Sequence, residues 1–234
     1  MPAFRLNGTP RQVSTYDVLG FDGDELSFVR HVMLFDSTVE ATLTFPTHDV
    51  PIAHMGPPIG HLNELQPNLP AVSTVSSARL TPPELRQMEL FVKEFIPERR
   101  ASNDLRELQG EENSHLMRAD YVIYPAVVRP SPDASCWRFN CCGFVMEAYR
   151  NAGIELIASG ADVPSVNLEI IQLAYPDVAG LLRNPRFRLR MGLMGESGWP
   201  VVFAGYVIAS LARSHDDIRQ TPYAPSPNDR YFVE

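Results

Sequence analysis

The sequence lacks any segment that would direct the chain to a membrane or carry it across one. Its first twenty residues, MPAFRLNGTPRQVSTYDVLG, contain no apolar stretch of the kind found in a secretory signal. The longest apolar run, PVVFAGYVIASLA at residues 200–212, is too short to cross a bilayer and is expected to form a buried helix or a strand–helix junction. We therefore expect no membrane span, and a location in the cytoplasm unless a dedicated secretion system exports the protein.

Positive charge is also scarce. The chain has 20 lysines and arginines against 28 aspartates and glutamates, a net charge of −8. No cluster of basic residues stands out of the kind that neutralises phosphates. We therefore expect no nucleic-acid partner.

Disulfide and metal-binding patterns are missing as well. There are only three cysteines, and the pair Cys141 and Cys142 is adjacent, which argues against a disulfide framework in a chain of 234 residues. The histidines at positions 48, 54 and 61 are spaced by six and seven residues, which matches no compact zinc-ligand pattern. We expect free thiols, no metal site and no cofactor.

Hydrophobic residues make up 44% of the chain, enough for a sizeable core, and their spacing predicts both strands and helices. Residues 26–35 and 39–45 alternate as the two strands of a β-hairpin, and residues 50–54 form a third short strand. Residues 119–128 are expected to form another strand. The prolines gather at 46–70, at 126–132 and at 222–227, where ordered loops are expected.

Two helices are predicted from their ends as well as from their apolar spacing. In TPPELRQMELFVKEFI, Thr81 begins a capping box that Glu84 completes, which predicts a helix over residues 82–96. In RFNCCGFVMEAYRNAGIEL, residues 138–156, Asn140 is a suitable N-cap and Gly153 a suitable residue for the left-handed turn that ends a helix. This second helix places Cys141 in its first turn.

A cysteine at the start of a helix is suited to nucleophilic chemistry. The unpaired N–H groups and the positive dipole end stabilise a thiolate and lower a thiol pKa that is otherwise about 8.5. Such a nucleophile needs an imidazole to accept its proton and a third group to orient the imidazole. His31 is the best-placed histidine, because it lies in the middle of an apolar strand, and Glu40 on the paired strand is the candidate for the orienting group.

Two stretches resemble motifs of the circularly permuted NlpC/P60-like thiol hydrolases, which belong to the papain-like superfamily together with the lecithin:retinol acyltransferase-like and PPPDE groups. RHVMLFDSTVEA, residues 30–41, is similar to the histidine hairpin of that family, and FNCCGFVMEAYRNAGIEL, residues 139–156, to its cysteine helix. The histidine precedes the cysteine in the chain, which is the permuted order. The resemblance covers about residues 20–157.

This resemblance implies both an architecture and a set of catalytic residues. The fold would be α+β and papain-like, with an antiparallel sheet that bears His31 packed against the helix that bears Cys141. Cys141 would be the nucleophile, His31 the general base and Glu40 the orienting group, while Cys142 takes a position usually held by serine. Residues 1–157 would form the catalytic core and residues 158–234 a helical extension on the same domain, with a loose tail from about residue 216.

Three functions follow as expectations. The first is a thiol amidase or peptidase that cleaves an amide bond in a peptide, of peptidoglycan or protein origin. The second is an acyltransferase or thioesterase that uses the same residues on an ester or lipid-like substrate. The third is a binding module that keeps the fold without activity.

Overall fold

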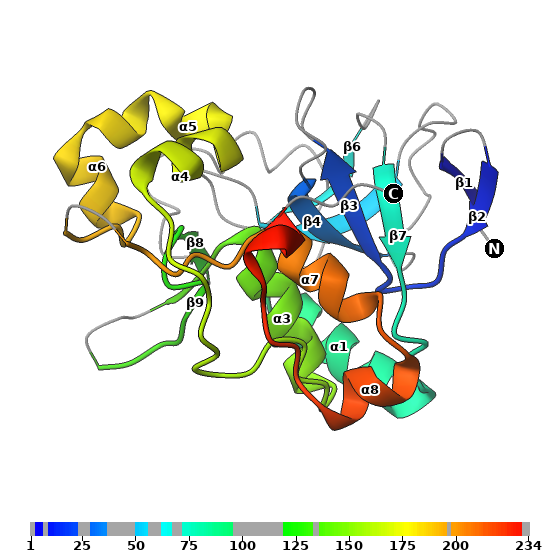
Figure 1. Ribbon diagram of the computed structural model, residues 1–234. Coiled ribbons are helices and arrows are strands. Elements are labelled where there is room, and N and C mark those ends of the chain that lie inside the picture. The colour runs from blue at the N-terminus through cyan, green and yellow to red at the C-terminus, as the bar shows by residue number, and fades with distance from the viewer. Residues whose placement is uncertain are drawn as a thin grey trace, which may run out of the picture.

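We describe the fold from a computed structural model of the chain, shown in Figure 1. The structure describes residues 3–6, 9–22, 29–36, 50–55, 62–66, 72–95, 119–132, 136–195 and 198–230. Within them the chain forms an α+β fold with small antiparallel and mixed sheets and a set of helices.

The largest sheet has five antiparallel strands in the order β6-β5-β4-β3-β7. These strands are β3 (Val18–Asp22), β4 (Val29–Phe35), β5 (Val50–His54), β6 (Leu62–Gln66) and β7 (Val72–Ser76). A separate hairpin of β1 (Ala3–Leu6) and β2 (Thr9–Gln12) precedes it. The predicted strand at residues 50–54 is confirmed.

The strand β4 lies at the centre of this sheet, between β3 and β5. Val29, Met33 and Phe35 are buried on one face of the strand, as the alternation predicts, but Val32 and Leu34 on the other face are buried too. The helices α3 (Cys141–Asn151) and α7 (Ala204–Leu211) both pack against β4, and Val32 and Leu34 belong to the core that they form with it. The predicted partner strand at residues 39–45 lies outside the described residues, so the hairpin stays a prediction.

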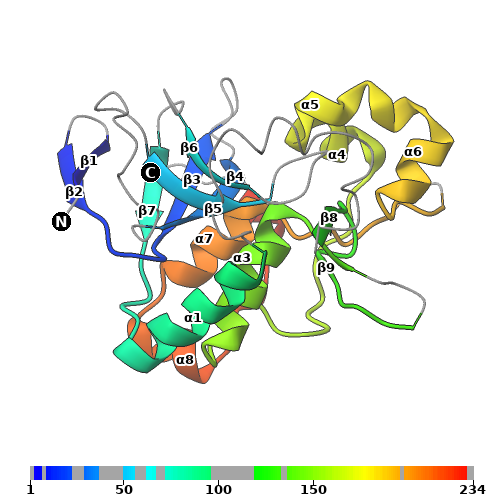
Figure 2. The same cartoon turned by 180° about the vertical axis from the view of Figure 1, so that it is seen from behind.

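The helix α1 (Pro82–Phe95) confirms the prediction made from its capping box. The carboxylate of Glu84 accepts a hydrogen bond from the backbone N–H of Thr81 at 2.6 Å. Met88, Phe91, Val92 and Phe95 are buried, and the two phenylalanine rings pack edge to face against Phe139. The apolar stripe of α1 therefore packs against α3, with Phe91 and Phe95 beside Phe144, and Figure 2 shows the two helices next to each other from behind.

The predicted strand over residues 119–128 is wrong as a single element. It is divided into β8 (Ala119–Tyr121) and β9 (Val127–Val128), which lie on either side of β10 (Trp137–Phe139), parallel and antiparallel to it. Ile123 and Tyr124 leave the ladder, and their N–H groups both donate to the carbonyl of Met191. Proline at 125 has no N–H for a ladder.

The chain beyond residue 157 is helical for most of its described length. It forms α4 (Leu168–Ala174), α5 (Pro176–Ala179), η2 (Leu181–Arg183), α6 (Pro185–Arg190), α7 (Ala204–Leu211), α8 (His215–Gln220) and η3 (Pro227–Arg230). The helices α4, α5 and α6 form a group at one side of the molecule (Figures 1 and 2). Among the helices of the described residues, none has the length and apolar character needed to cross a membrane.

The helix α7 is part of the core. It is the buried helix expected within residues 200–212, and it packs against β3, β4 and α3. Val207 and Ile208 are fully buried. The extension after residue 157 therefore completes the packing around the central strand.

The helix α8 occupies the place where the sequence predicts the beginning of a loose tail. Arg219 donates to both carboxylate oxygens of Glu84 at 3.1 and 3.0 Å and to the carbonyl oxygens of Ala78 and Arg79. Ile218 beside it is buried. These contacts fix α8 to the first turn of α1, and a composition-based expectation does not anticipate them.

Candidate active site

The cysteine helix α3 (Cys141–Asn151) begins at Cys141, as predicted. The side-chain oxygen of Asn140 accepts a hydrogen bond from the N–H of Gly143 at 2.7 Å and so caps the helix. Gly153, just past the other end, has a φ of 81°, the left-handed conformation expected there. The thiol of Cys141 therefore lies in the first turn, where the backbone N–H groups are not used by the helix.

The cap residue also holds the start of α3 against two other parts of the chain. The Asn140 side-chain amide donates to the carbonyls of Ile123, at 3.1 Å, and Val202, at 3.4 Å. Its backbone N–H donates to Ala126 at 3.1 Å. Asn140 is fully buried, so these bonds are shielded from water. They position Cys141 relative to both the β8–β9 segment and the segment that leads into α7.

The structure brings Cys141 and His31 together. The helix α3 packs on β4, and the half-buried His31 imidazole lies close enough to the Cys141 sulfur to hydrogen-bond to it. Within the described residues, the strand β5 pairs with β4 at Leu34 and Phe35 and does not pair with Val32. The backbone N–H of Val32 donates to the Cys141 sulfur. The central strand therefore offers this sulfur both an imidazole and a backbone donor.

The second cysteine adds a third polar group. The sulfur atoms of Cys141 and Cys142 are 3.8 Å apart, and both residues are buried. The hydrogen bond from Cys142 is the largest cause that lowers the pKa of Cys141, and burial opposes it. The charge and hydrogen bond of His31 and the N–H of Val32 lower the pKa further. As a result, the pKa of Cys141 lies well below that of a free thiol. Burial and the neighbouring sulfur raise the pKa of Cys142. The arrangement favours a Cys141 thiolate beside a protonated Cys142.

Two buried tyrosines border the thiol pair, and sequence reasoning missed both. Burial, followed by the nearby charges of Tyr175 and both cysteines, raises the pKa of Tyr121 well above its ordinary value. Burial and the same cysteines also raise the pKa of Tyr175, although the nearby polar groups of Tyr121 and Asn140 partly offset this. Both phenols therefore stay protonated. A tyrosine in an apolar strand or before a proline carries no sequence signal of such a position.

The hydroxyl of Tyr121 is buried and lacks a hydrogen bond of ordinary geometry within the described residues, although it is close enough to Tyr175 for each to affect the other's pKa. A buried donor without an acceptor costs about 1–3 kcal/mol. A carbonyl oxygen bound next to the thiols would satisfy it. This hydroxyl is therefore a candidate donor to a substrate.

The remaining predicted residues have different outcomes. Glu40 lies outside the described residues, so its orienting role stays a prediction. His48 and His61 also lie outside them, and His54 lies on β5. Among the described residues, no three histidine, cysteine or acidic side chains gather as metal ligands. The three cysteines are free thiols.

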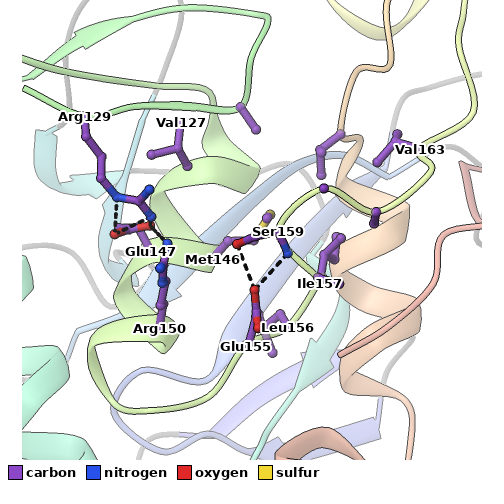
Figure 3. A pocket seen from close by; sticks show the side chains of 15 residues that line it. Val127, Arg129, Met146, Glu147, Arg150, Glu155, Leu156, Ile157, Ser159 and Val163 are labelled. Atoms are coloured by element: carbon purple, nitrogen blue, oxygen red, sulfur yellow. Dashed lines mark hydrogen bonds and ion pairs between the residues drawn. The ribbon is translucent and has the colours of Figure 1, made fainter. Parts of the chain in front are cut away.

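A pocket of about 250 Å³ lies on another side of α3 and is shown in Figure 3. It is bounded by Met146, Glu147 and Arg150 of the helix, by β9 and by the loop at residues 155–163. The carboxylate of Glu147 is held by Arg129 at 2.9 Å, which ties α3 to the segment after β9. Neither Cys141 nor His31 lines this pocket, so it is distinct from the thiol site.

The site thus consists of a cysteine at a helix start, an imidazole on the adjacent strand, a neighbouring thiol and two phenol groups. Comparison with known proteins adds no further assignment: no protein-family model, curated protein or solved structure matches the chain.

Proposed function

We propose that the protein is a thiol hydrolase in which Cys141 attacks an amide carbonyl and His31 acts as the general acid and base. The single observation that carries this proposal is the contact between the Cys141 sulfur, at the start of α3, and the His31 imidazole on β4. The resemblance of the two motifs to the permuted NlpC/P60-like enzymes supports the same assignment. In this proposal the sheet and helix form a permuted papain-like core.

The first half of the reaction forms an acyl-enzyme. The Cys141 thiolate attacks the substrate carbonyl carbon, and the carbon–oxygen π electrons move to the oxygen as a C–S bond forms. The backbone N–H of Cys141 and the Tyr121 hydroxyl donate to this oxyanion. Protonated His31 then gives its proton to the leaving nitrogen, the C–N bond breaks, and an amine departs.

The second half returns the enzyme to its starting state. Neutral His31 takes a proton from water as the water oxygen attacks the thioester carbonyl carbon. Collapse of the second tetrahedral intermediate breaks the C–S bond, releases a carboxylic acid product and restores the Cys141 thiolate beside protonated His31. Glu40 is proposed to orient the imidazole during both halves.

The decisive test measures the rate of iodoacetamide alkylation as a function of pH and maps the modified residue by mass spectrometry. Wild-type Cys141 is expected to react at pH values well below the ordinary thiol pKa of about 8.5. His31→Ala is expected to move its reaction toward that pH. Cys136, which is only half-buried and lies outside the thiol site, is the internal control.

Slow alkylation of Cys141 with an ordinary thiol pH profile, unchanged by His31→Ala, would contradict the proposal. If the thiolate is present, hydrolysis of peptide amides and of acyl esters separates the two substrate classes. A trapped thioester whose acyl group derives from a peptide supports the amidase, whereas one that carries a fatty acyl chain supports the acyltransferase or thioesterase.

A further inference from the structure

The segment between α5 and the loop before α7 has a composition unlike that of the rest of the chain. Residues 178–195 contain four arginines and no acidic residue, in a protein whose net charge is −8. The four are Arg183, Arg186, Arg188 and Arg190. This stretch is a cluster of basic residues, so the expectation that none stands out, which was based on the overall charge balance, is wrong for residues 183–190.

Exposed apolar side chains gather in the same region. The described residues include five large hydrophobic side chains that are more than half exposed, and four of them belong to the α4–α6 group and the turn that follows it. These four are Leu173 at 52%, Leu181 at 51%, Leu189 at 60% and Met194 at 70%. The fifth, Leu90, lies on α1. Single exposed leucines are ordinary on a protein surface, but four in one region are a feature of that region.

The helix α6 presents the two kinds of side chain on one face. Arg186, Leu189 and Arg190 are three and four positions apart, so they share a side of the helix, and all three are exposed. The short helix η2, with exposed Leu181 and Arg183, packs beside α6. We call these five residues the arginine–leucine face.

The charges of this face are largely uncompensated. Among the described residues, Arg183 and Arg186 take part in no ion pair, and Arg190 is 3.7 Å from Asp120 while its side chain remains 61% exposed. The exposed face of α1 offers a contrast. There Arg86 and Leu90 are also exposed, but Glu84, Glu89 and Glu94 on the same helix supply negative charge.

We propose that the arginine–leucine face docks the protein on an anionic lipid surface. Arginines next to exposed leucines match such a surface, because the phosphate groups meet the guanidinium groups while the leucines enter the apolar boundary below them. A second copy of the chain fits poorly, since a two-fold contact would bring the same arginines face to face. This proposal does not depend on the catalytic proposal.

The test is co-sedimentation of the full chain with vesicles. Binding is expected to vesicles of phosphatidylglycerol mixed with phosphatidylcholine at low ionic strength, to weaken as salt is added, and to be absent with phosphatidylcholine alone. The variant Arg186→Gln, Leu189→Ser is expected to lose at least about fivefold in vesicle affinity, the effect of removing one basic residue. Equal thermal midpoints for the variant and the wild type show that the fold is retained.

The matched control is Arg86→Gln, Leu90→Ser, which removes the same two side-chain types from the exposed face of α1 and is expected to bind like the wild type. The proposal is overturned if the wild type does not bind anionic vesicles at low salt, if it binds neutral vesicles equally well, or if both double variants lose the same affinity. Self-association without lipid that only the α6 variant abolishes would instead identify the face as a dimer contact. Binding of an acidic peptide or an oligonucleotide in place of vesicles would also overturn it.

Discussion

A Cys141 thiolate has donors of three kinds, two from neighbouring residues of β4 and one from the next residue of α3. His31 supplies an imidazole, Val32 a backbone N–H and Cys142 a thiol. The Cys142 donor has a particular advantage, because its own raised pKa keeps the proton on its sulfur at pH values where Cys141 is ionised. A hydrogen bond to a charged group contributes about 1.5–3 kcal/mol.

Replacing the second thiol is therefore expected to weaken the first as a nucleophile. Cys142→Ala removes the donor and should slow alkylation of Cys141 at mildly acidic pH by about tenfold, because a smaller fraction is then ionised. Cys142→Ser keeps a hydroxyl donor and should retain most of the rate. The measurement is the pH profile of alkylation, with Cys136→Ala as the control. Equal profiles for the alanine and serine variants would show that the 3.8 Å contact carries no such bond.

The Tyr121 hydroxyl is expected to act on the oxyanion. Tyr121→Phe keeps the buried ring and removes one donor, so the kcat for amide hydrolysis should fall by about 100-fold. The reaction of Cys141 with iodoacetamide forms no tetrahedral intermediate and should change far less. An equal loss in both reactions would point to a disturbed thiol and contradict the role in the oxyanion site.

At the scale of elements, the start of α3 depends on a glycine. A Cβ atom added at Gly143 would lie 1.8 Å from the carbonyl oxygen of Ala126, which belongs to the backbone and cannot turn aside. Gly143→Ala should therefore lower the free energy of unfolding by about 3 kcal/mol or more. It should also displace Cys141, so that alkylation at low pH is lost. Urea unfolding measures the first effect.

Two other glycines serve as controls for that measurement. Gly180 has a right-handed backbone and no atom within 4 Å of an added Cβ, so Gly180→Ala should change stability by less than about 0.5 kcal/mol. Gly153 has the same open space but a φ of 81°, and Gly153→Ala should cost about 1–2 kcal/mol. If Gly143→Ala proved no worse than Gly153→Ala, the close approach of α3 to Ala126 would be wrong.

The contact between α8 and α1 predicts a dependence of stability on pH. Burial would raise the pKa of Glu84, but hydrogen bonds from Arg219 and Thr81 outweigh it and lower the pKa. A carboxylate with a lowered pKa in the folded state stabilises the protein above its unfolded pKa of about 4.3, and this stability is lost as the pH falls through the folded value. Glu84→Gln should therefore flatten the acid side of the stability profile.

The matched control for this prediction lies on the same helix. Glu89 bonds to Lys93 on the exposed side of α1, so Glu89→Gln removes a carboxylate without touching the contact to α8. Urea unfolding at several acidic pH values compares the two variants with the wild type. A Glu84→Gln profile parallel to that of the wild type would contradict the prediction.

The sequence predicted the elements whose signals are local. The helix α1 and the helix α3 could be identified because caps and apolar spacing lie within a few residues of each other, and β5 because it is a short apolar run. The division of residues 119–128 into β8 and β9 could not be predicted, because it depends on the carbonyl of Met191, a residue far along the chain.

The same distinction holds within the site. Cys141 could be identified from its place at a helix start and His31 from its place in a strand. Tyr121 and Tyr175 could not, because only tertiary packing brings their hydroxyls to the thiols. The opposed pKa shifts of the two cysteines also depend on the folded structure, because burial and the contact between the two sulfur atoms are their main causes, with His31 and Val32 of β4 adding to the lowering at Cys141.

At the scale of the whole molecule, the extension after residue 157 is needed to complete the core. The hydroxyl of Ser210 on α7 donates to the carbonyl oxygen of Leu156 at 2.8 Å. The backbone N–H of Tyr223 donates to the same oxygen at 2.9 Å. A chain that ends at residue 157 would expose the surface of β4 that α7 covers. We expect this fragment to lack the near-ultraviolet circular dichroism of the folded protein.

Supplying residues 158–234 as a separate chain in the same cell should restore that signal, since the missing contacts are noncovalent. A fragment 1–157 that folds alone, with a cooperative urea transition, would contradict the prediction. It would also make the first 157 residues an independent domain.

The order of the elements along the chain has a consequence for synthesis. The strand β4 leaves the ribosome first, but the helix that brings Cys141 and the helix α7 that covers the strand follow much later. At about 5–20 residues per second, α7 appears roughly ten to thirty seconds after β4. Until α3 has followed, His31 has no thiol beside it, and until α7 has followed, the strand lacks part of its cover. The activity proposed for the site would therefore be confined to chains whose translation has passed α7.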